Sequence, residues 1–171
     1  MTIESTTSSE KGFILRSPSL EAGEMVPESY VFNGEGCSGK NLSPALEWEG
    51  APEGTKSFAL TVFDPDAPAE GGWRHWTVLN IPGDIHEIEE GASSKHTLPR
   101  EAVEVENDFG ETQYGGPCPP KGDRAHRYVF TLYALKSDHL NIDPDTDRVT
   151  VETSLQNNTL GKATFTVRYA H

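Results

Sequence analysis

Short runs of alternating hydrophobic and polar residues recur along the chain, and this alternation is typical of β-strands that bury one face. The clearest runs span residues 57–63, 76–81, 126–135 and 163–169, and shorter ones lie at 13–15, 30–32, 46–48 and 103–108. Residues 149–160 instead place Val151, Leu155 and Leu160 on one side of a weak helix, with Gly161 as its expected end. The segment 83–99 is polar and predicts a loop. The pattern as a whole predicts a mainly β fold with few short helices.

Composition places the chain in the size range of one domain. It has 171 residues, and its 16 glycines and 12 prolines favour a β-rich, loop-rich protein over a helical bundle. The first ten residues are polar and lack the basic and apolar regions of a signal peptide, so a cytoplasmic protein is expected. We expect a disordered N-terminal tail at residues 1–12 and a single folded domain at residues 13–171.

The charge of the chain restricts its partners. The formal net charge of −13 repels phosphate backbones, which argues against nucleic acid and against anionic membrane surfaces as general partners. No run approaches the roughly 20 apolar residues of a membrane span, so no integral membrane segment is expected.

Two cysteines, Cys37 and Cys118, each lie in a glycine-rich loop. In a reducing cytoplasm the expectation is two free thiols, and a disulfide that joins the two loops is the alternative.

One strand and the turn after it bring carboxylates close to an imidazole. The strand at 57–63 continues into residues 64–68, Asp-Pro-Asp-Ala-Pro, where both prolines restrict the backbone to extended or turn conformations. Trp73 and His75 follow, directly ahead of the next strand. The sequence therefore predicts two carboxylates and an imidazole at one end of a sheet.

A second segment supplies another imidazole and a phenol. Residues 115–122, Gly-Gly-Pro-Cys-Pro-Pro-Lys-Gly, predict a loop of fixed shape, and a strand follows from residue 126. The period of two places His126, Tyr128 and Phe130 on one face of that strand. A second imidazole therefore begins a strand, with a phenol two residues later.

These two segments resemble the signatures of the phosphatidylethanolamine-binding protein family, also called Raf kinase inhibitor-like proteins. The carrying residues are 64–68, His75, Gly116, 119–122 and 126–128. The bacterial and archaeal YbhB/YbcL-like branch is also similar at residues 33–34, 43–48 and 107–110. The resemblance covers the chain from about residue 15 onward. It implies a β-sandwich-type fold with a large antiparallel sheet, a smaller sheet and few short helices.

The resemblance also implies a small-ligand pocket that phosphate-like head groups occupy. His75 and His126 would donate hydrogen bonds to the anion, joined by backbone N–H groups near Gly116. Asp64 would accept from an imidazole, fix its tautomer and favour its charged form. The residues expected to bind the ligand are Asp64, Asp66, Ala67, Pro68, Trp73, His75, Gly116, Pro119, Pro120, His126 and Tyr128.

Two other interpretations of these residues stay open. His75, His126 and the carboxylates are ligand types that zinc accepts, but their spacing matches no known zinc signature, so no metal and no other cofactor is expected. In the other interpretation, the buried histidines and aspartates serve only to satisfy loops around the strand ends.

The expected function is a non-enzymatic regulatory module that binds a small anion, a phosphate-like group or a phospholipid head group. The resemblance implies that this binding is coupled to a kinase or a protease. The alternative is a small hydrolase with His75 or His126 as general acid or base, although the sequence has neither a nucleophile elbow nor a clear triad. Some bacterial relatives are dimers, so a monomer and a homodimer both stay open.

Overall fold

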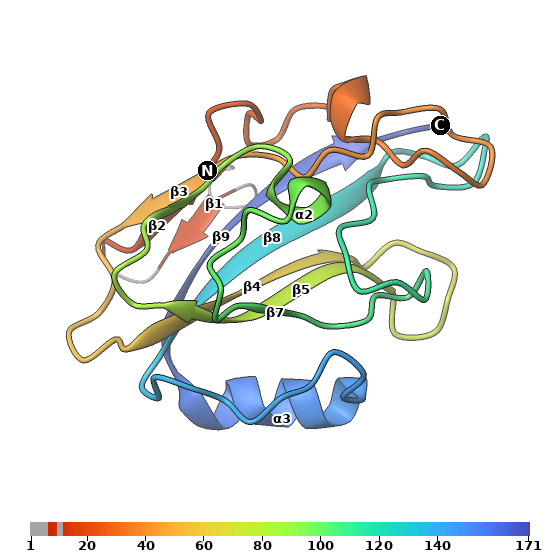
Figure 1. The fold of residues 1–171 in the computed structure, drawn as a ribbon. Coiled ribbons are helices and arrows are strands. Elements are labelled where there is room, and N and C mark those ends of the chain that lie inside the picture. Colours follow the sequence, from red (N-terminus) through yellow and green to blue (C-terminus); the bar gives the residue numbers. More distant parts are fainter. Residues whose placement is uncertain (1–6, 10–11) are drawn as a thin grey trace.

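The computed structural model describes residues 7–9 and 12–171, and within them two antiparallel sheets dominate (Figure 1). The large sheet has the strand order β1-β9-β8-β4-β5-β7 and the small sheet the order β2-β3-β6. The large-sheet strands are β1 (Thr7–Ser9), β4 (Ser57–Asp64), β5 (Trp73–Pro82), β7 (Val103–Glu104), β8 (His126–Leu135) and β9 (Thr159–Tyr169). The small-sheet strands are β2 (Ile14–Arg16), β3 (Leu46–Glu49) and β6 (Glu87–Ile88). The expected mainly β fold with a larger and a smaller antiparallel sheet is confirmed.

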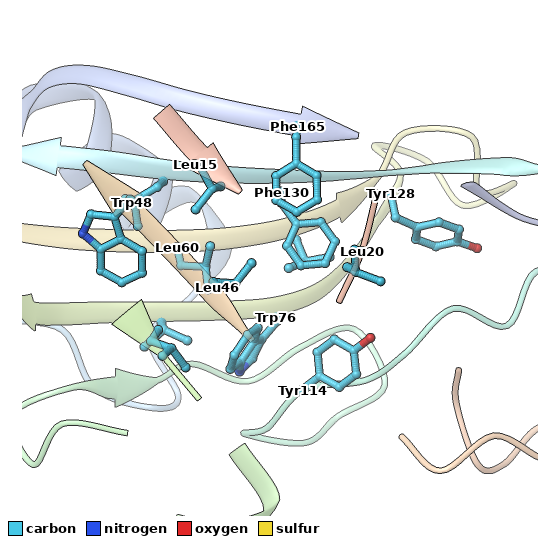
Figure 2. Close-up of a cluster of buried hydrophobic side chains, with 14 of the residues drawn as sticks. Leu15, Leu20, Leu46, Trp48, Leu60, Trp76, Tyr114, Tyr128, Phe130 and Phe165 are labelled. Carbon is cyan, nitrogen blue, oxygen red and sulfur yellow. The ribbon is translucent and has the colours of Figure 1, made fainter. Parts of the chain in front are cut away.

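The core lies between the two sheets and is built from one face of each. Alternate residues of β4, Phe58, Leu60 and Val62, are buried against residues of the small sheet such as Trp48. Figure 2 shows this cluster, in which the rings of Phe130 and Phe165 stack across β8 and β9 at 4.9 Å. Full burial of one such side chain contributes about 1.5–3 kcal/mol, so the alternation read from the sequence accounts for the layering.

The opposite face of the large sheet is covered by helix α3 (Arg148–Asn158), as Figure 1 shows. Val151 and Leu155 pack there with Ala59 and Leu79, which are residues of β4 and β5 that point away from the main core. The helix expected at 149–160 therefore forms, but it ends at Asn158, and β9 begins at Thr159. Gly161 does not end the helix as expected; it pairs with Ala134 inside the sheet.

Two other segments differ from the expectations. Residues 30–32 do not form a strand, because a 3₁₀ helix (Glu28–Tyr30) follows Pro27 and the backbone of Phe32 bonds to loop residues instead of to a sheet. The expected loop at 83–99 contains β6 and the short helix α2 (Ala92–Lys95). Both errors concern short elements: β6 depends on pairing with the distant strand β3, and the 3₁₀ helix and α2 are single turns too short to show a periodic pattern.

Most of the expected tail lies outside the described residues, since residues 1–6 and 10–11 are not described. Thr7–Ser9 form β1 and pair with residues 163–165 of β9. In the described part of the chain, none of the helices has the length and apolar character that crossing a membrane requires.

Candidate functional site

A cavity of about 370 Å³ opens at the end of the large sheet where β4 ends and β5 and β8 begin. Its lining contains most of the residues expected to bind a ligand, namely Asp64, Ala67, Pro68, Trp73, His75, Pro119, Pro120 and His126. The antiparallel pairing of β4 with both neighbours is the reason that these residues meet. Asp66, Gly116 and Tyr128 do not line the cavity, and their contacts give them other roles.

His126 is held between two carboxylates. Its Nδ1 lies 2.7 Å from Oδ2 of Asp64, and its Nε2 lies 2.9 Å from Oδ2 of Asp123. Burial lowers the pKa of His126, but the hydrogen bonds to Asp64 and Asp123 outweigh burial and raise that pKa above its ordinary value. Both nitrogens of His126 face carboxylate oxygens, which favours the imidazolium that donates from both, and the expected pairing of Asp64 with an imidazole is present.

His75 is in the opposite state. Its Nδ1 lies 2.7 Å from the carbonyl oxygen of Gly115, and a carbonyl only accepts, so Nδ1 carries the proton. Burial lowers the pKa of His75 and outweighs its hydrogen bond to Gly115, which favours the neutral ring. Its Nε2 is consequently an acceptor, and no hydrogen bond within the described residues occupies it.

The ring of Tyr128 packs against the rings of both imidazoles. It meets His75 edge to face at 5.2 Å and stacks near His126 at 6.5 Å between centroids. Burial and the neighbouring charge of Asp64 raise the pKa of Tyr128 well above its usual range, so the phenol stays protonated. Tyr128 thus fixes the positions of both histidines without lining the cavity.

Asp66 fastens the turn after β4 to the start of β8. Its carboxylate accepts hydrogen bonds from the backbone N–H, Nε and Nη2 of Arg127 at 2.8–3.0 Å. The side-chain hydrogen bonds from Arg127 lower the pKa of Asp66 to about 2. The backbone N–H of Asp66 also donates to Oδ1 of Asp64 at 2.8 Å, which orients the carboxylate that holds His126.

Gly116 joins two loops instead of facing the cavity. Its N–H donates to Oδ1 of Asn41 at 2.7 Å, so this N–H is already occupied. A Cβ at position 116 would lie 2.1 Å from the carbonyl oxygen of Tyr30, so the approach of the two loops requires glycine.

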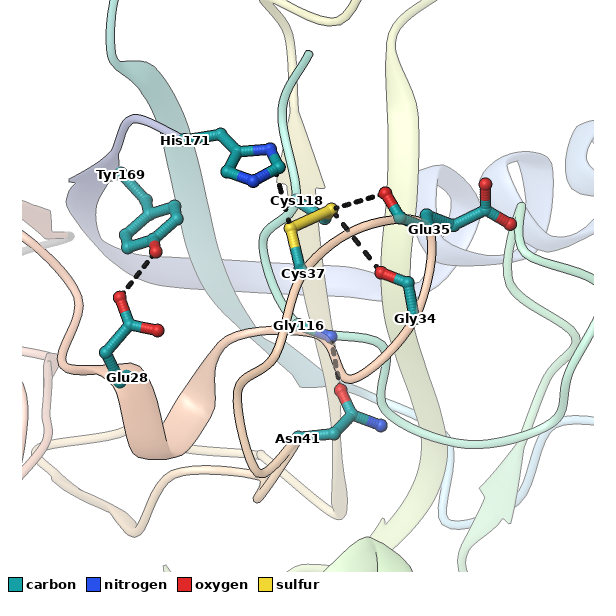
Figure 3. Close-up of a disulfide and its surroundings, with 9 residues drawn as sticks. All are labelled: Glu28, Gly34, Glu35, Cys37, Asn41, Gly116, Cys118, Tyr169 and His171. Carbon is teal, nitrogen blue, oxygen red and sulfur yellow. Dashed lines mark hydrogen bonds between the residues drawn. A yellow bond between two sulfur atoms is a disulfide. The ribbon is translucent and has the colours of Figure 1, made fainter. Parts of the chain in front are cut away.

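The same two loops are linked by a disulfide between Cys37 and Cys118 (Figure 3). The expectation of two free thiols is therefore wrong, and the alternative is right. The hydrogen bond between Gly116 and Asn41 holds the two loops close together. The Cα atoms of the cysteines lie 6.0 Å apart, a distance that a disulfide can span.

The cavity also contains residues that the sequence analysis did not name as ligand residues: Glu35, Ala69, Asp108, Phe109 and Cys118. Asp108 accepts a hydrogen bond from the backbone N–H of Arg74 and forms a 2.9 Å ion pair with its guanidinium. The ring of Phe109 meets Trp73 edge to face at 5.5 Å, so the two aromatic side chains form one wall. The family similarity at residues 107–110 pointed to Asp108 and Phe109. It did not reveal their place in the cavity, because they contact Arg74 and Trp73, which are distant in the sequence.

Comparisons with known proteins agree with one another. The model of the family described as phosphatidylethanolamine-binding protein matches residues 16–170. The chain is 45% identical to UPF0098 protein YbcL of Escherichia coli K12 over 159 residues, 92% of this chain and 87% of that protein. It is 39% identical to UPF0098 protein YbhB of the same organism over 157 residues, 91% of this chain and 99% of that protein.

Solved structures share the fold. The crystal structure of E. coli YbcL matches with a TM-score of 0.90 at 44% identity, over 94% of this chain and 99% of that one. A carboxypeptidase Y inhibitor complexed with its cognate proteinase matches with a TM-score of 0.54 at 18% identity, over 93% of this chain and 83% of that one. The second likeness concerns the fold alone.

Proposed function

Because the chain belongs to the phosphatidylethanolamine-binding protein family, we propose that its cavity binds a small phosphate-like anion and that the protein is a ligand-binding module. The observation that carries the proposal is the position of His126 at the cavity wall between two carboxylates, which raise its pKa and favour a positively charged donor. The carboxylate of Asp64 accepts from Nδ1 of His126 and so stabilises its positive charge, and Asp64 is buried. The Nε2–H of His126 donates to a carboxylate that a ligand can replace as acceptor.

That group is Asp123. Its side chain is 42% exposed, whereas the side chains of His126 and Asp64 are about 5% exposed. An incoming anion takes the Nε2–H of His126, and the Asp123 carboxylate turns out into solvent, where water satisfies it. A hydrogen bond from a charged donor contributes roughly 1.5–3 kcal/mol, so this exchange needs only a better acceptor than Asp123.

His75 enters the proposal as an acceptor, not as the donor expected from the sequence. Since its Nδ1–H is bonded to Gly115, only the lone pair of Nε2 is left for a ligand. The best-matched ligand therefore accepts a hydrogen bond from His126 and donates one to His75. The monoanion of phosphate or of a phosphate monoester can do both, because it keeps at least one P–OH group. A phosphodiester, the group in a phospholipid, has no such proton.

The walls of the cavity suit a ligand of head-group size. A volume of about 370 Å³ is at the lower end for small-molecule sites. Trp73, Phe109, Pro119 and Pro120 supply stiff apolar surface, and the acidic Asp108 is neutralised by Arg74. Apolar walls exclude water and strengthen the few polar contacts that a small anion makes.

The hydrolase alternative has less support from this geometry. Hydrogen bonds of the two imidazoles go to carboxylates and a carbonyl, and in the described part of the chain neither imidazole reaches a hydroxyl or thiol that it could activate. Cys118 is held in the disulfide. The positions of both rings therefore favour binding over nucleophilic catalysis.

Regulation of a kinase or a protease stays a prediction, since the cavity itself carries no information about a protein partner. The cytoplasmic location also stays a prediction. The disulfide Cys37–Cys118 argues against it, since disulfides are typical of oxidising compartments.

Calorimetric titration of inorganic phosphate at about pH 6 tests the proposal. We expect the His126→Gln variant to bind phosphate about tenfold or more weakly than the wild type, because the charged donor is lost. The matched control is His139→Gln, which changes an exposed histidine outside the cavity and should leave the affinity unchanged.

Circular dichroism verifies that each variant keeps its fold. Wild-type protein that shows no phosphate binding would contradict the proposal itself. Equal phosphate affinity in the wild type and in His126→Gln would contradict the role given to His126.

A further inference from the structure

His171 lies directly against the disulfide that joins the two loops (Figure 3). Its Nδ1 is 3.8 Å from Sγ of Cys37. The two sulfur atoms and a ring nitrogen of His171 all lie within 4.8 Å of one another. Neither the fold nor the phosphate proposal gives these three side chains a common role.

The three residues are brought together by contacts that do not involve the S–S bond. The backbone N–H of Phe32 donates to the carbonyl oxygen of Pro117 at 3.0 Å, and Asn41 binds the N–H of Gly116. The phenol of Tyr169 donates to Glu28 and so fixes the end of β9, two residues before His171. None of these contacts requires the S–S bond, so we expect them to hold the three residues near one another in the reduced protein.

We propose that the reduced protein binds a zinc ion through the thiolates of Cys37 and Cys118 and the imidazole of His171. A dithiol supplies the reduction: it transfers two electrons and two protons to the disulfide, yields two cysteine thiols and itself becomes a disulfide. Zinc then replaces the proton of each thiol, and both protons pass to solvent. The proposal goes beyond anion binding and does not depend on it.

The geometry fits a tetrahedral ion. With Zn–S bonds of about 2.3 Å and Zn–N bonds of about 2.0–2.1 Å, the sulfur and nitrogen ligands lie about 3.5 Å apart. The observed distance of 3.8 Å between Cys37 Sγ and His171 Nδ1 is already close to that value. The two sulfurs have to separate to about 3.8 Å, which side-chain rotation achieves at a Cα–Cα distance of 6.0 Å. The ring nitrogen of His171, within 4.8 Å of both sulfurs, has to lie about 3.5 Å from that of Cys118.

The chemistry of the ligands selects the metal. Two thiolates and an imidazole are soft and borderline ligands, which bind zinc and not magnesium or calcium, whose sites are built from oxygen atoms. Three protein ligands leave the fourth tetrahedral position to water or to another small ligand.

The test uses the full chain, reduced with a dithiol that is then removed under argon. Zinc is titrated against a chromophoric chelator, and cobalt(II) gives a second readout through its thiolate charge-transfer absorption. We expect one zinc ion per reduced protein, no such site in the oxidised protein, and at least about tenfold weaker binding in His171→Ala. The control His139→Ala changes an exposed histidine elsewhere and should match the wild type.

His171→Ala retains both cysteines, so its oxidised form keeps the disulfide and can be checked for folding before reduction. Loss of the cobalt–thiolate band in Cys118→Ser would support the proposal. Equal zinc affinity in the reduced and oxidised wild type would overturn it. Unchanged zinc affinity in reduced His171→Ala would overturn the role of His171 and, with it, the three-ligand site.

Discussion

Simultaneous replacement of Cys37 and Cys118 by serine is expected to lower the free energy of unfolding by roughly 4 kcal/mol, because the disulfide spans 81 positions of the sequence. The cross-link removes conformations from the unfolded chain, and a loop of this length gives a large entropic effect in that description. The loss is a large fraction of the 5–15 kcal/mol typical of a folded domain.

Urea denaturation measures this effect. Three samples are compared: the oxidised wild type, the wild type reduced in the presence of a chelator, and the Cys37→Ser/Cys118→Ser variant. The second and third should unfold at the same, lower urea concentration, since both lack the cross-link, and the chelator excludes stabilisation by metal. A double variant as stable as the oxidised wild type would contradict the expectation.

Methyl phosphate is expected to bind about tenfold or more tightly than dimethyl phosphate at about pH 5.5. Both ligands carry one negative charge at this pH, but only methyl phosphate, with a second pKa of about 6, keeps a P–OH group. That group can donate to the lone pair of His75 Nε2, whose ring bonds Gly115 through Nδ1–H, whereas dimethyl phosphate leaves this buried acceptor unsatisfied. An unsatisfied buried polar group costs about 1–3 kcal/mol, which corresponds to roughly 5- to 150-fold in affinity.

The preference should depend on pH in one direction. The P–OH donor exists below the ligand pKa of about 6 and is lost as the pH rises through it, so its hydrogen bond to His75 contributes to the preference at pH 5.5 and not at pH 8. At pH 5.5 both ligands carry one negative charge, so the charge of His126 affects both alike and cancels from the ratio of affinities there, whereas at pH 8 the second charge of methyl phosphate adds its own attraction to His126. Calorimetry with both ligands at both pH values measures this ratio. Equal affinities at pH 5.5 would contradict the acceptor role of His75 and leave the phosphate proposal intact.

The long strands of the fold could be read from the sequence because alternation is a local signal. The strand around Phe130 alternates between a buried and a more exposed face over many residues, whereas β4 around Phe58 is buried on both faces at residues 57–60 and was read from its β-forming residues. The strand at Glu87–Ile88 could not be predicted, because it pairs with the distant strand β3. The 3₁₀ helix near Tyr30 is a single turn closed by local hydrogen bonds, too short to show a periodic pattern. Gly161 was misread because its helix-ending tendency is overridden by pairing with β8.

In the candidate site, too, some contacts could be predicted from the sequence and others could not. The pairing of Asp64 with an imidazole was expected from the family resemblance, but which of the two imidazoles it would meet was not, and the structure gives His126. The roles of Asp123 and of the Gly115 carbonyl were not expected, because loop geometry alone determines which acceptor each imidazole meets. The charge of each histidine depends on these partners, and spacing in the sequence does not reveal it.

The protonation states of the two imidazoles are the central claim, and nitrogen NMR of the histidine rings tests them most directly. At about pH 6.5, the ordinary histidine pKa, the raised pKa of His126 predicts that both of its nitrogens are protonated, and the lowered pKa of His75 predicts a bare Nε2. Adding phosphate should shift the Nε2 signals of both rings more than their Nδ1 signals, because the Nδ1 partners Asp64 and Gly115 stay in place. A protonated Nε2 on His75 in the free protein, or Nε2 signals that phosphate leaves unchanged, would contradict the account.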